Sequence, residues 1–173
     1  MNKAGIHRSL SSVEVELEPP DSADARACLS AYFRELSVRF EGGYDPDRDN
    51  TAPDGDMQPP SGAFVVARLD GQAVGCGGLK RVGETAGEIK RVWTAPHARG
   101  LGVARRIVRR LEAEARRMGL ATVRLDTNKA LTEAHALYRS EGYREVARFN
   151  DNPYAHHWFE KTLADHPLAP LSN

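Results

Sequence analysis

The sequence predicts an α/β protein with a mixed, mostly antiparallel sheet and flanking helices. Short segments rich in β-branched residues alternate with segments whose apolar residues recur at helical spacing. The first half reads as consecutive strands joined by short turns, which favours antiparallel pairing. In the second half a strand, a helix and another strand follow one another, which predicts a parallel crossover pair.

The chain begins its ordered part with a strand and a helix. Residues 13–17 alternate between apolar residues and glutamates, which predicts a strand with one buried face. Two prolines end that strand, and Asp21 or Ser22 can cap the following helix with a side-chain oxygen. The apolar side of this helix is expected to contain Ala25, Cys28, Leu29, Tyr32, Leu36 and Phe40.

A long polar segment follows the first helix. Residues 41–61 are rich in Gly, Pro, Asp and Asn, and we expect a loop there. A loop of this length is either a mobile excursion or a segment that covers the substrate. In the second case, Arg39 and Tyr44 are candidate substrate contacts.

Two further strands are predicted to form a hairpin. Residues 63–69 and 73–79 are apolar, and the Asp-Gly pair between them is a strong hairpin signal. A third antiparallel strand follows after a turn. The glycines of the second strand indicate a bulge or the close approach of another segment, and they are Gly75, Gly77 and Gly78.

The stretch from Glu88 to Arg110 combines a strand, a glycine turn and a helix. The strand ends at Pro96, because proline lacks the N–H that a sheet requires. The first N–H groups of the helix have no partner within it, and the dipole makes that end positive. Gly100 and Gly102 leave the backbone open, so the turn predicts an anion site. The apolar residues that recur at helical spacing, with Ile107 beside them, are Leu101, Ala104, Val108, Leu111 and Ala115.

The remaining elements alternate in the same way. Glycine terminates the arginine-rich helix at Gly119, because glycine readily adopts the left-handed conformation of a helix end. The expected elements after it are a strand at 122–126, a helix capped by Thr132 and ending near Gly142, strands at 143–147 and 157–161, and a turn at 150–153.

Length and composition predict one domain at residues 12–163 between loose tails at residues 1–11 and 164–173. The 173 residues suit a single core, and 40% of them are hydrophobic. No apolar run is long enough to cross a membrane, and the N-terminus lacks an apolar signal core. Cys28 and Cys76 are too few for a disulfide scaffold, so we expect reduced thiols and a cytoplasmic location.

Charge is divided along the chain although the net charge is zero. Glu14 to Asp56 contains 12 acidic and 4 basic residues, a balance of −8, whereas Lys80 to Arg117 contains 11 basic and 4 acidic residues, a balance of +7. The basic part suits nucleic acid or a phosphorylated cofactor. Alternatively, its arginines form the solvated face of one amphipathic helix.

Two motifs resemble one protein family. Arg99 to Ala104, RGLGVA, is similar to the RGxGxA core of the Gcn5-related N-acetyltransferases, and Ala136 to Tyr143, ALYRSEGY, is similar to that family's LYxxxGF/Y signature. His97 departs from the family, which has Gln or Arg at this position. The resemblance covers roughly Ala63 to Phe159 and implies a sheet whose fourth and fifth strands splay apart.

The resemblance also implies acetyl-coenzyme A as co-substrate. In the family, the pantetheine arm lies in the gap between the splayed strands. Backbone contacts to pantetheine are implied for Val92, Trp93 and Thr94, and a further cofactor contact for Asn128. Pyrophosphate binding is implied for Arg99, Gly100, Leu101, Gly102, Val103 and Ala104.

Catalytic roles follow from the same resemblance. Tyr138 is implied as the general acid that protonates the departing thiolate, although a core aromatic is the alternative. Glu88 is the candidate base or part of its water relay; the alternative is an exposed strand glutamate that pairs with a neighbouring lysine. Asn150, Asn152 and Tyr154 are expected in the substrate wall, although the Asn-Asp-Asn-Pro sequence is also a turn. No metal is expected, since the adjacent histidines lack a ligand spacing.

The predicted function is transfer of acetyl from acetyl-coenzyme A directly to a primary amine of a small molecule, within a ternary complex. The alternatives are a non-catalytic acetyl-coenzyme A sensor and acetylation of a protein or peptide amine. No nucleic acid or membrane partner is expected, and the protein is a monomer or homodimer. We expect acids near the cleft to attract a cationic amine, unless they only solvate the loop: Glu35, Glu41, Asp45 and Asp47.

Overall fold

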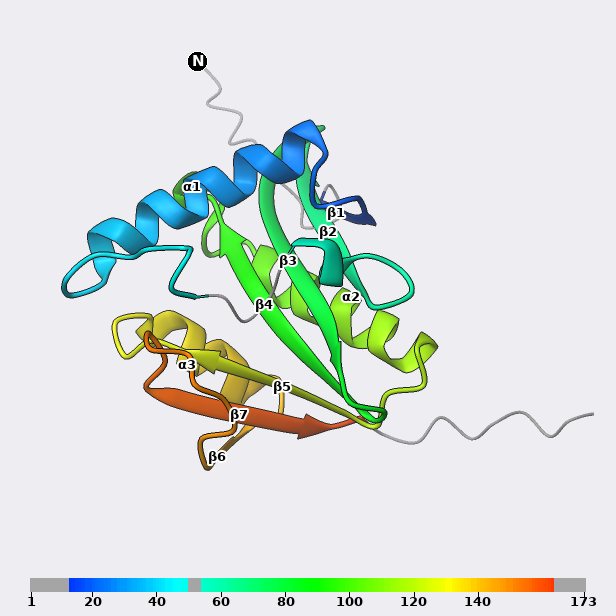
Figure 1. Cartoon of the computed structure of the whole chain (residues 1–173). Coiled ribbons are helices and arrows are strands. Elements are labelled where there is room, and N and C mark those ends of the chain that lie inside the picture. The colour runs from blue at the N-terminus through cyan, green and yellow to red at the C-terminus, as the bar shows by residue number, and fades with distance from the viewer. Residues whose placement is uncertain (1–12, 50–53, 164–173) are drawn as a thin grey trace, which may run out of the picture.

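The computed structural model describes residues 13–49 and 54–163, and the strands in this part of the chain form one seven-stranded sheet. Its order is β1-β2-β3-β4-β5-β7-β6 (Figure 1). All neighbouring pairs are antiparallel except β4 and β5, so the prediction of a mixed, mostly antiparallel sheet is confirmed. The strands are β1 (Val13–Leu17), β2 (Gly62–Leu69), β3 (Gln72–Val82), β4 (Ala86–Thr94), β5 (Thr122–Thr127), β6 (Arg144–Val146) and β7 (His157–Thr162).

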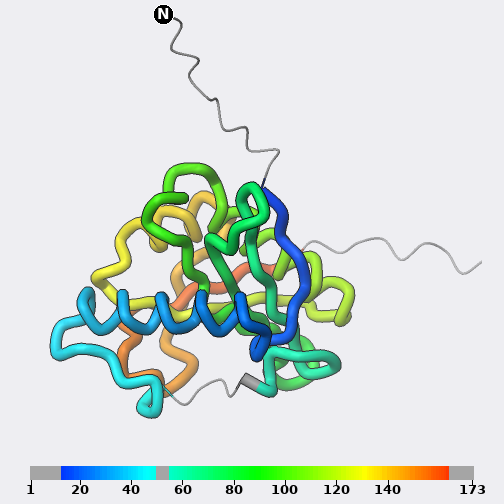
Figure 2. Tube along the Cα trace, turned by 90° about the horizontal axis from the view of Figure 1, so that it is seen from above, coloured from blue at the N-terminus to red at the C-terminus, as the bar shows by residue number. Residues whose placement is uncertain are grey.

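Helices cover both faces of the sheet. The described helices are α1 (Ala23–Arg39), α2 (Val103–Arg117) and α3 (Thr132–Ser140), with short 3-10 helices η2 (Asp54–Met57) and η3 (Pro96–Ala98). In Figure 2, the view from above, α1 runs along one side of the molecule and the sheet lies between it and α2. None of the helices in the described ranges has the length and apolar character that crossing a membrane requires.

Alternation along β2 divides the core into two clusters. Phe64 and Val66 pack with α1 and with Met57 of η2, whereas Val65 and Ala67 face the α2 side. Both clusters are buried because side chains of a strand point alternately to its two faces. The α2 cluster extends to β5 and β7 through Leu125 and Phe159, and it is the larger of the two.

The glycines of β3 allow the layers to approach the sheet closely. A Cβ at Gly77 would lie 2.6 Å from Ile107 Cγ2 of α2, and one at Gly78 would lie 2.2 Å from Met57 Sδ. The register between β3 and β4 also shifts between Cys76 and Gly78. The structure therefore confirms both features that these glycines predict, a bulge and close packing.

Strands β4 and β5 separate after a short paired section. Their parallel pairing runs only from Ala86 opposite Thr122 to Glu88 opposite Arg124. Beyond it β4 remains bonded to β3 and β5 to β7, and Figure 1 shows the two strands fanning apart. Arg91 has a φ of +59° within the bulged section of β4. The predicted splay of the central strands is thus confirmed.

Local differences from the predicted elements are small. Ser22 caps α1 by accepting a 3.1 Å hydrogen bond from Ala25 N, but the prediction that Thr132 caps α3 is wrong. The cap residue is Leu131, and its side chain makes no capping bond. The expected loop at 41–61 contains η2, because Met57 is fully buried against the sheet; residues 50–53 and both predicted tails lie outside the described residues.

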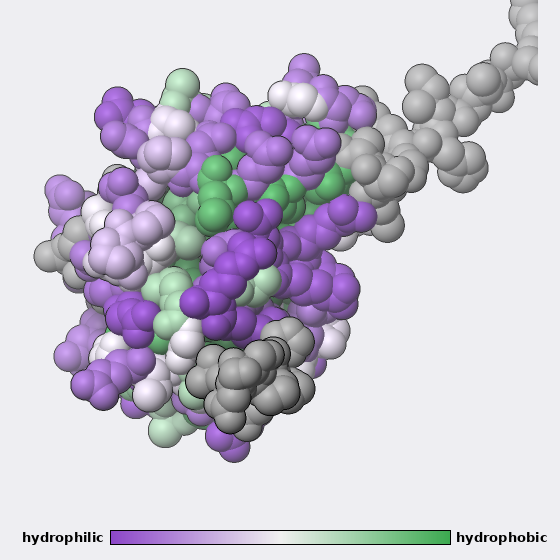
Figure 3. Space-filling model, turned by 90° about the vertical axis from the view of Figure 1, so that its right-hand side faces the viewer, coloured by the Kyte–Doolittle hydropathy of each residue, from purple (hydrophilic) through white to green (hydrophobic). Residues whose placement is uncertain are grey.

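The arginines of α2 bind neighbouring elements. Arg106 and Arg110 donate to the carbonyl oxygens of Val13 and Val15 at 3.1 and 2.8 Å, which attaches β1 to the helix. Arg105 and Arg109 pair with Glu141 beyond α3. The charged side chains contribute to a mostly hydrophilic exterior, as the face in Figure 3 illustrates.

Substituting Gly77 with alanine tests the close packing of α2 on β3. The added methyl group would overlap Ile107, so we expect a loss of about 1–3 kcal/mol in the free energy of unfolding. Gly55→Ala is the matched control, because a Cβ there meets nothing within 4 Å. Equal denaturant midpoints for the two variants would contradict this packing.

Candidate active site

Two adjoining cavities occupy the region where β4 and β5 separate. The larger, of about 320 Å3, adjoins η3 and the start of α2, and we call it the glycine-loop cavity. The smaller, of about 80 Å3, adjoins the end of β5, and we call it the β5 cavity. Both are lined by Tyr32, Leu36, Val92, Leu131, Ala134 and Tyr138, so they meet at these residues.

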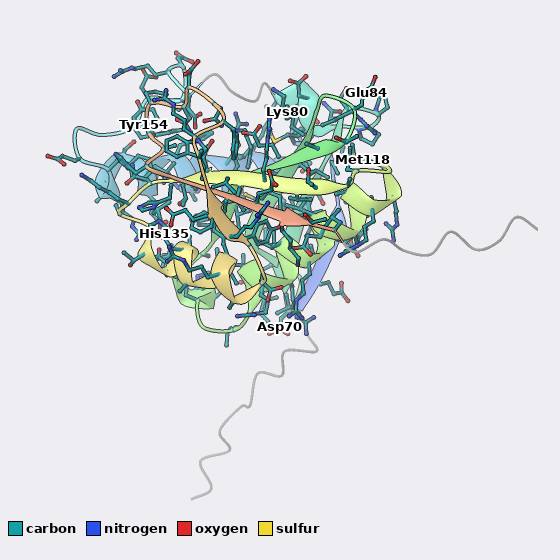
Figure 4. All side chains as sticks on the ribbon, turned by 90° about the horizontal axis from the view of Figure 1, so that it is seen from below. Asp70, Lys80, Glu84, Met118, His135 and Tyr154 are labelled. Atoms are coloured by element: carbon teal, nitrogen blue, oxygen red, sulfur yellow. The ribbon has the colours of Figure 1, made fainter. Side chains whose placement is uncertain are left out.

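The cavities lie at the open end of the sheet. In Figure 4, Lys80, Glu84 and Met118 lie toward the end where β3, β4 and β5 are joined, whereas Tyr154 and His135 lie toward the opposite end. Arg81 links the closed end by donating to the carbonyl oxygens of Glu84 and Met118. The two cavities therefore lie at the end of the sheet where β4 and β5 are apart, and Arg81 joins the chain segments at the opposite end.

Backbone geometry opens the glycine-loop cavity at the start of α2. Gly100 and Gly102 have φ values of +79° and +76°, which only glycine adopts without strain, and Gly102 is the cap residue of the helix. A Cβ at Gly100 would meet nothing within 4 Å, so this face of the turn is open. The positive end of a 15-residue helix thus borders the cavity.

The predicted cofactor residues largely gather around this cavity. Leu101 packs against the core and is not among the lining residues. Asn128 lines the β5 cavity instead. The predicted residues that line the glycine-loop cavity are Val92, Trp93, Thr94, Arg99, Gly100, Gly102, Val103 and Ala104.

Two buried polar atoms in the wall of this cavity have no hydrogen-bond partner. They are Trp93 Nε1 and Thr94 Oγ1, and Arg124 Nε is the other such atom in the described residues. An unsatisfied buried donor costs about 1–3 kcal/mol, so such groups usually have a partner. A polar ligand in the cavity would supply one, and the residues present therefore fit a ligand with polar groups.

Ion pairs cross the rim of the glycine-loop cavity. Arg99 pairs with Glu35 of α1, and Arg39 of α1 pairs with Glu133 of α3. The Arg39 guanidinium holds the pKa of Glu133 below its usual range. Arg39 and Glu35, expected on the acceptor side, therefore lie on the glycine-loop side, because the C-terminal half of α1 crosses that cavity.

Aromatic rings form much of the β5 cavity wall. Tyr44 and Tyr154 lie 4.7 Å apart between ring centroids, and both contact Phe40. The Tyr44 hydroxyl donates to Asp49 Oδ2 at 2.7 Å. The predicted substrate residues Tyr44, Asn152 and Tyr154 line this cavity, and the charged residues among the lining are Asp49, Lys90, Arg91 and Asp126.

Asn128 connects β5 with the segment before β7. Its Nδ2 donates to Tyr154 O at 2.8 Å, and its Oδ1 accepts from Ala130 N at 2.9 Å. The carbonyl oxygen of Asn128 lies 2.9 Å from His135 Nε2. Both groups of the amide side chain thus already have protein partners, so the structure gives Asn128 a wall-building role beside the predicted cofactor contact.

Tyr138 lies where the two cavities meet. It lines both, and only 7% of the residue is exposed. Its ring contacts Tyr143 and Phe159 at centroid distances of 5.8 and 6.1 Å, which fixes its position on α3. Burial raises the pKa of its hydroxyl, which therefore keeps its proton at neutral pH.

The predicted base Glu88 lies outside the lining of both cavities. It belongs to the section of β4 that is still paired with β5, where no gap exists. Glu88 Oε1 lies 2.9 Å from Lys90 Nζ and accepts from Asn150 Nδ2 at 3.1 Å. Glu88 therefore pairs with a lysine, as the alternative predicted, but it is buried where that alternative expected an exposed side chain, and its role as a base stays a prediction.

Asp126 and Asp49 are the two cavity carboxylates that the sequence analysis missed, and Asp126 lies on β5. It lines the β5 cavity, and its Oδ2 accepts from Asn150 Nδ2 at 2.6 Å while its Oδ1 accepts from Asn152 Nδ2 at 2.9 Å. Asn150 lies behind this carboxylate and is not among the lining residues. The alternation of residues 122–127 could have indicated it, because Arg124 and Asp126 share the face opposite buried Val123 and Leu125.

Three acids of the loop after α1, Glu41, Asp45 and Asp47, are exposed and do not line either cavity, whereas Asp49 of the same loop lines the β5 cavity. Asp45 nevertheless contacts the β5 cavity wall, because its backbone N–H donates to Tyr154 Oη at 2.9 Å. Glu41 forms a 3.9 Å pair with exposed Lys129, and Asp47 N donates to Asp45 Oδ1. Attraction of a cationic acceptor by Glu41, Asp45 and Asp47 stays a prediction.

The histidines near β7 make protein contacts. His157 Nδ1 lies 2.6 Å from Glu145 Oε1, and its ring lies 4.6 Å from that of His135. His156 Nδ1 accepts from Lys129 N. No group of three or more side chains suited to hold a metal ion occurs in the described ranges 13–49 and 54–163.

Comparison with known proteins identifies the family. Residues 29–143 match the acetyltransferase (GNAT) family, which is more than half of the chain. This chain belongs to that family. An IAA acetyltransferase of Azospirillum brasilense is 38% identical over 99 residues, which are 57% of this chain and 63% of that relative, so less than two thirds of the relative's length is matched.

Two further matches extend over more of the chain. N-alpha-acetyltransferase RimI of Mycobacterium tuberculosis is 34% identical over 128 residues, which are 72% of this chain and 75% of that protein. The crystal structure of an aminoglycoside 6'-N-acetyltransferase complexed with coenzyme A has a TM-score of 0.65 at 18% identity, covering 89% and 99% of the two chains. The predicted GNAT fold, acetyl-coenzyme-A-dependent N-acetyltransferase class and acetyl-coenzyme A co-substrate are confirmed.

Gly102→Val tests whether the glycine turn admits coenzyme A. Gly119→Val is a matched control, because both glycines have φ +76° and they lie at opposite ends of α2. Both variants lose stability through the same backbone strain. Coenzyme A should raise the Tm of the wild type and of the Gly119 variant by mass action, but not that of the Gly102 variant. Equal Tm shifts by coenzyme A in both variants would contradict the assignment of the glycine turn as the coenzyme A site.

Proposed function

We propose that this GNAT protein acetylates a primary amine of a small molecule by direct transfer within a ternary complex. The observation that carries the proposal is the meeting of two cavities of different character at one buried tyrosine, Tyr138. Direct transfer requires the donor and the acceptor to be bound together with their reacting atoms in contact. Two cavities that share six lining residues allow this.

The donor belongs in the glycine-loop cavity. The open turn at Gly100 and Gly102 and the positive end of α2 suit the pyrophosphate of acetyl-coenzyme A. The unpartnered polar atoms of Trp93 and Thr94 suit its polar arm. Because Arg99 pairs with Glu35 across the rim, an anionic ligand would compete with that carboxylate for the guanidinium.

The acceptor belongs in the β5 cavity. Its volume of about 80 Å3 favours a small molecule or the end of a slender chain. Aromatic faces, which attract a primary ammonium group, border it together with two carboxylates and the two cations Lys90 and Arg91. The related proteins carry different names, IAA acetyltransferase, N-alpha-acetyltransferase and aminoglycoside 6'-N-acetyltransferase, so their names do not select one acceptor.

Tyr138 is proposed as the general acid. When the amine nitrogen bonds to the acetyl carbon, the C–S bond breaks and its electron pair leaves with sulfur. Tyr138 lines both cavities where they adjoin, and its phenol hydroxyl carries a proton at neutral pH. It can therefore give the thiolate a proton and recover one from the nitrogen.

A panel of amines tests the proposed function. Release of coenzyme A from acetyl-coenzyme A would be measured with 2-phenylethylamine, aspartate, spermidine, kanamycin and a short peptide with a free N-terminus. We expect a small amine to give the highest kcat/KM. Binding of acetyl-coenzyme A without release in the presence of any amine would favour the sensor alternative, and a peptide as best acceptor would favour protein acetylation.

Tyr138→Phe removes the proposed acid while the ring stays packed. We expect kcat to fall about 10²-fold or more, the usual scale for a lost acid or base, with an unchanged Tm shift by acetyl-coenzyme A. Tyr143→Phe is the control. The ring centroids of Tyr143 and Tyr138 lie 5.8 Å apart, but the Tyr143 hydroxyl donates to buried Glu112 and Tyr143 lines neither cavity. The control should lose stability and keep kcat. Wild-type kcat in Tyr138→Phe, with chemistry rate-limiting, would make Tyr138 a packing residue.

A further inference from the structure

The acceptor side of the proposed reaction still requires a group that deprotonates the amine. A primary amine is mostly protonated at neutral pH, and an ammonium has no lone pair for attack. Two carboxylates lie near the point where β4 and β5 separate, Glu88 and Asp126. Only one of them borders a cavity, and the contacts of each carboxylate distinguish their roles.

Asp126 is presented to the β5 cavity. It lies one residue from the end of β5, beyond the last residue of that strand that pairs with β4, so no strand covers its inner edge. Its side chain is 9% exposed, and it lines the cavity together with Tyr138 and the aromatic residues Tyr44 and Tyr154. An acceptor nitrogen in this cavity would therefore be near both the carboxylate and the proposed acid.

The segment between β6 and β7 orients the Asp126 carboxylate. Asn150 and Asn152 each direct an amide N–H to a different carboxylate oxygen, at 2.6 and 2.9 Å. Each amide is itself held: Asn150 Oδ1 accepts from Trp158 Nε1 at 3.0 Å, and Asn152 Oδ1 accepts from Tyr154 N at 3.0 Å. These bonds use one acceptor site on each oxygen, and an ionised carboxylate has about four.

Glu88, in contrast, lies close to two cationic side chains. Lys90 Nζ is 2.9 Å from Glu88 Oε1 but 3.8 Å from Asp126 Oδ2, and Arg124 Nε is 4.0 Å from Glu88 Oε2. Lys90 therefore lies closer to Glu88 than to Asp126, whereas Asp126 accepts one hydrogen bond on each carboxylate oxygen from a neutral amide and borders the cavity.

We propose, resting on the proposed acetyltransferase function, that Asp126 is the base that binds and deprotonates a primary ammonium acceptor, and that Asn150 and Asn152 position its carboxylate. The ammonium gives one proton to Asp126, which releases it to solvent. The freed electron pair bonds to the acetyl carbon and the thiolate leaves. The second proton of the nitrogen replaces the one that Tyr138 gives to sulfur, so the products are an amide, a thiol and one proton.

The surroundings of Asp126 favour proton uptake. Burial raises the pKa of Asp126, and the neighbouring charge of Glu88 raises it further, whereas Lys90 and the amides of Asn150 and Asn152 lower it. The buried hydroxyls of Tyr32 on α1 and Tyr138 on α3 also face this carboxylate. Because the net direction is upward, kcat/KM should fall on the acid side as Asp126 becomes protonated.

Asp126→Asn tests the proposal with the panel amine of highest kcat/KM. The variant should lose about 10²–10⁴-fold in kcat/KM and the acid limb of its pH profile, with an unchanged Tm shift by acetyl-coenzyme A. Asp151→Asn is the matched control, since Asp151 lies in the same segment but is fully exposed and pairs with Arg148. Wild-type activity and an intact acid limb in Asp126→Asn would overturn the proposal.

Two substitutions of neighbours test it without removing Asp126. Asn152→Ala removes a donor that lowers the pKa of Asp126, so the acid limb should move to higher pH. Glu88→Gln removes a charge that raises that pKa and frees Lys90 toward Asp126, so the limb should move to lower pH. The proposal would be overturned, and Glu88 identified as the base, if Glu88→Gln lost activity while the acid limb of Asn152→Ala stayed at the pH of the wild type.

Failure of the proposed function would look different. If the wild type bound acetyl-coenzyme A but released no coenzyme A with any panel amine, the transferase function itself would be wrong, and the role of Asp126 with it. If the wild type is active, the proposal for Asp126 is decided by the variants alone, since each predicts a stated change in rate or in the pH of the acid limb.

Discussion

The end of pairing between β4 and β5 is the constraint on which the site depends. Three residue pairs join these strands, and after them each strand follows its other neighbour. The inner edges of both strands then lack strand partners, and backbone groups of this kind need partners from side chains, water or a ligand. Both cavities, the unpartnered atoms of Trp93 and Thr94, and the exposure of Asp126 to a cavity lie at this gap.

Packing on either side keeps the gap from closing. The glycines of β3 allow α2 and η2 to approach the sheet, which supports β4 along its length. On the other side of the gap, β5 is bonded to β7 over all six of its residues. The ion pair between Arg39 and Glu133 joins α1 to α3 across the opening; because it is partly exposed, it contributes more to their relative position than to stability.

The elements were predictable where their cause is local. Alternation at residues 13–17, the Asp-Gly turn and the glycines before α2 each reflect backbone geometry within a few residues, and all correspond to observed elements. The predictions of a cap at Thr132 and of a continuous loop at 41–61 were less accurate. A cap depends on the orientation of one side chain, and η2 exists because Met57 is buried under strands that are distant in the sequence.

By itself, the sequence determined the fold class, the glycine turn and the family, since these follow from short motifs and from the periodicity of single elements. The tertiary structure decided which acid borders a cavity. Glu88 and Asp126 are both strand acids, and nothing local distinguishes them. Their positions depend on the register that places Glu88 opposite Arg124, where the sheet is still paired, and on the return of Asn150 and Asn152 from the far end of the chain to hold Asp126. Register and chain return are long-range properties, so only the folded structure assigns them.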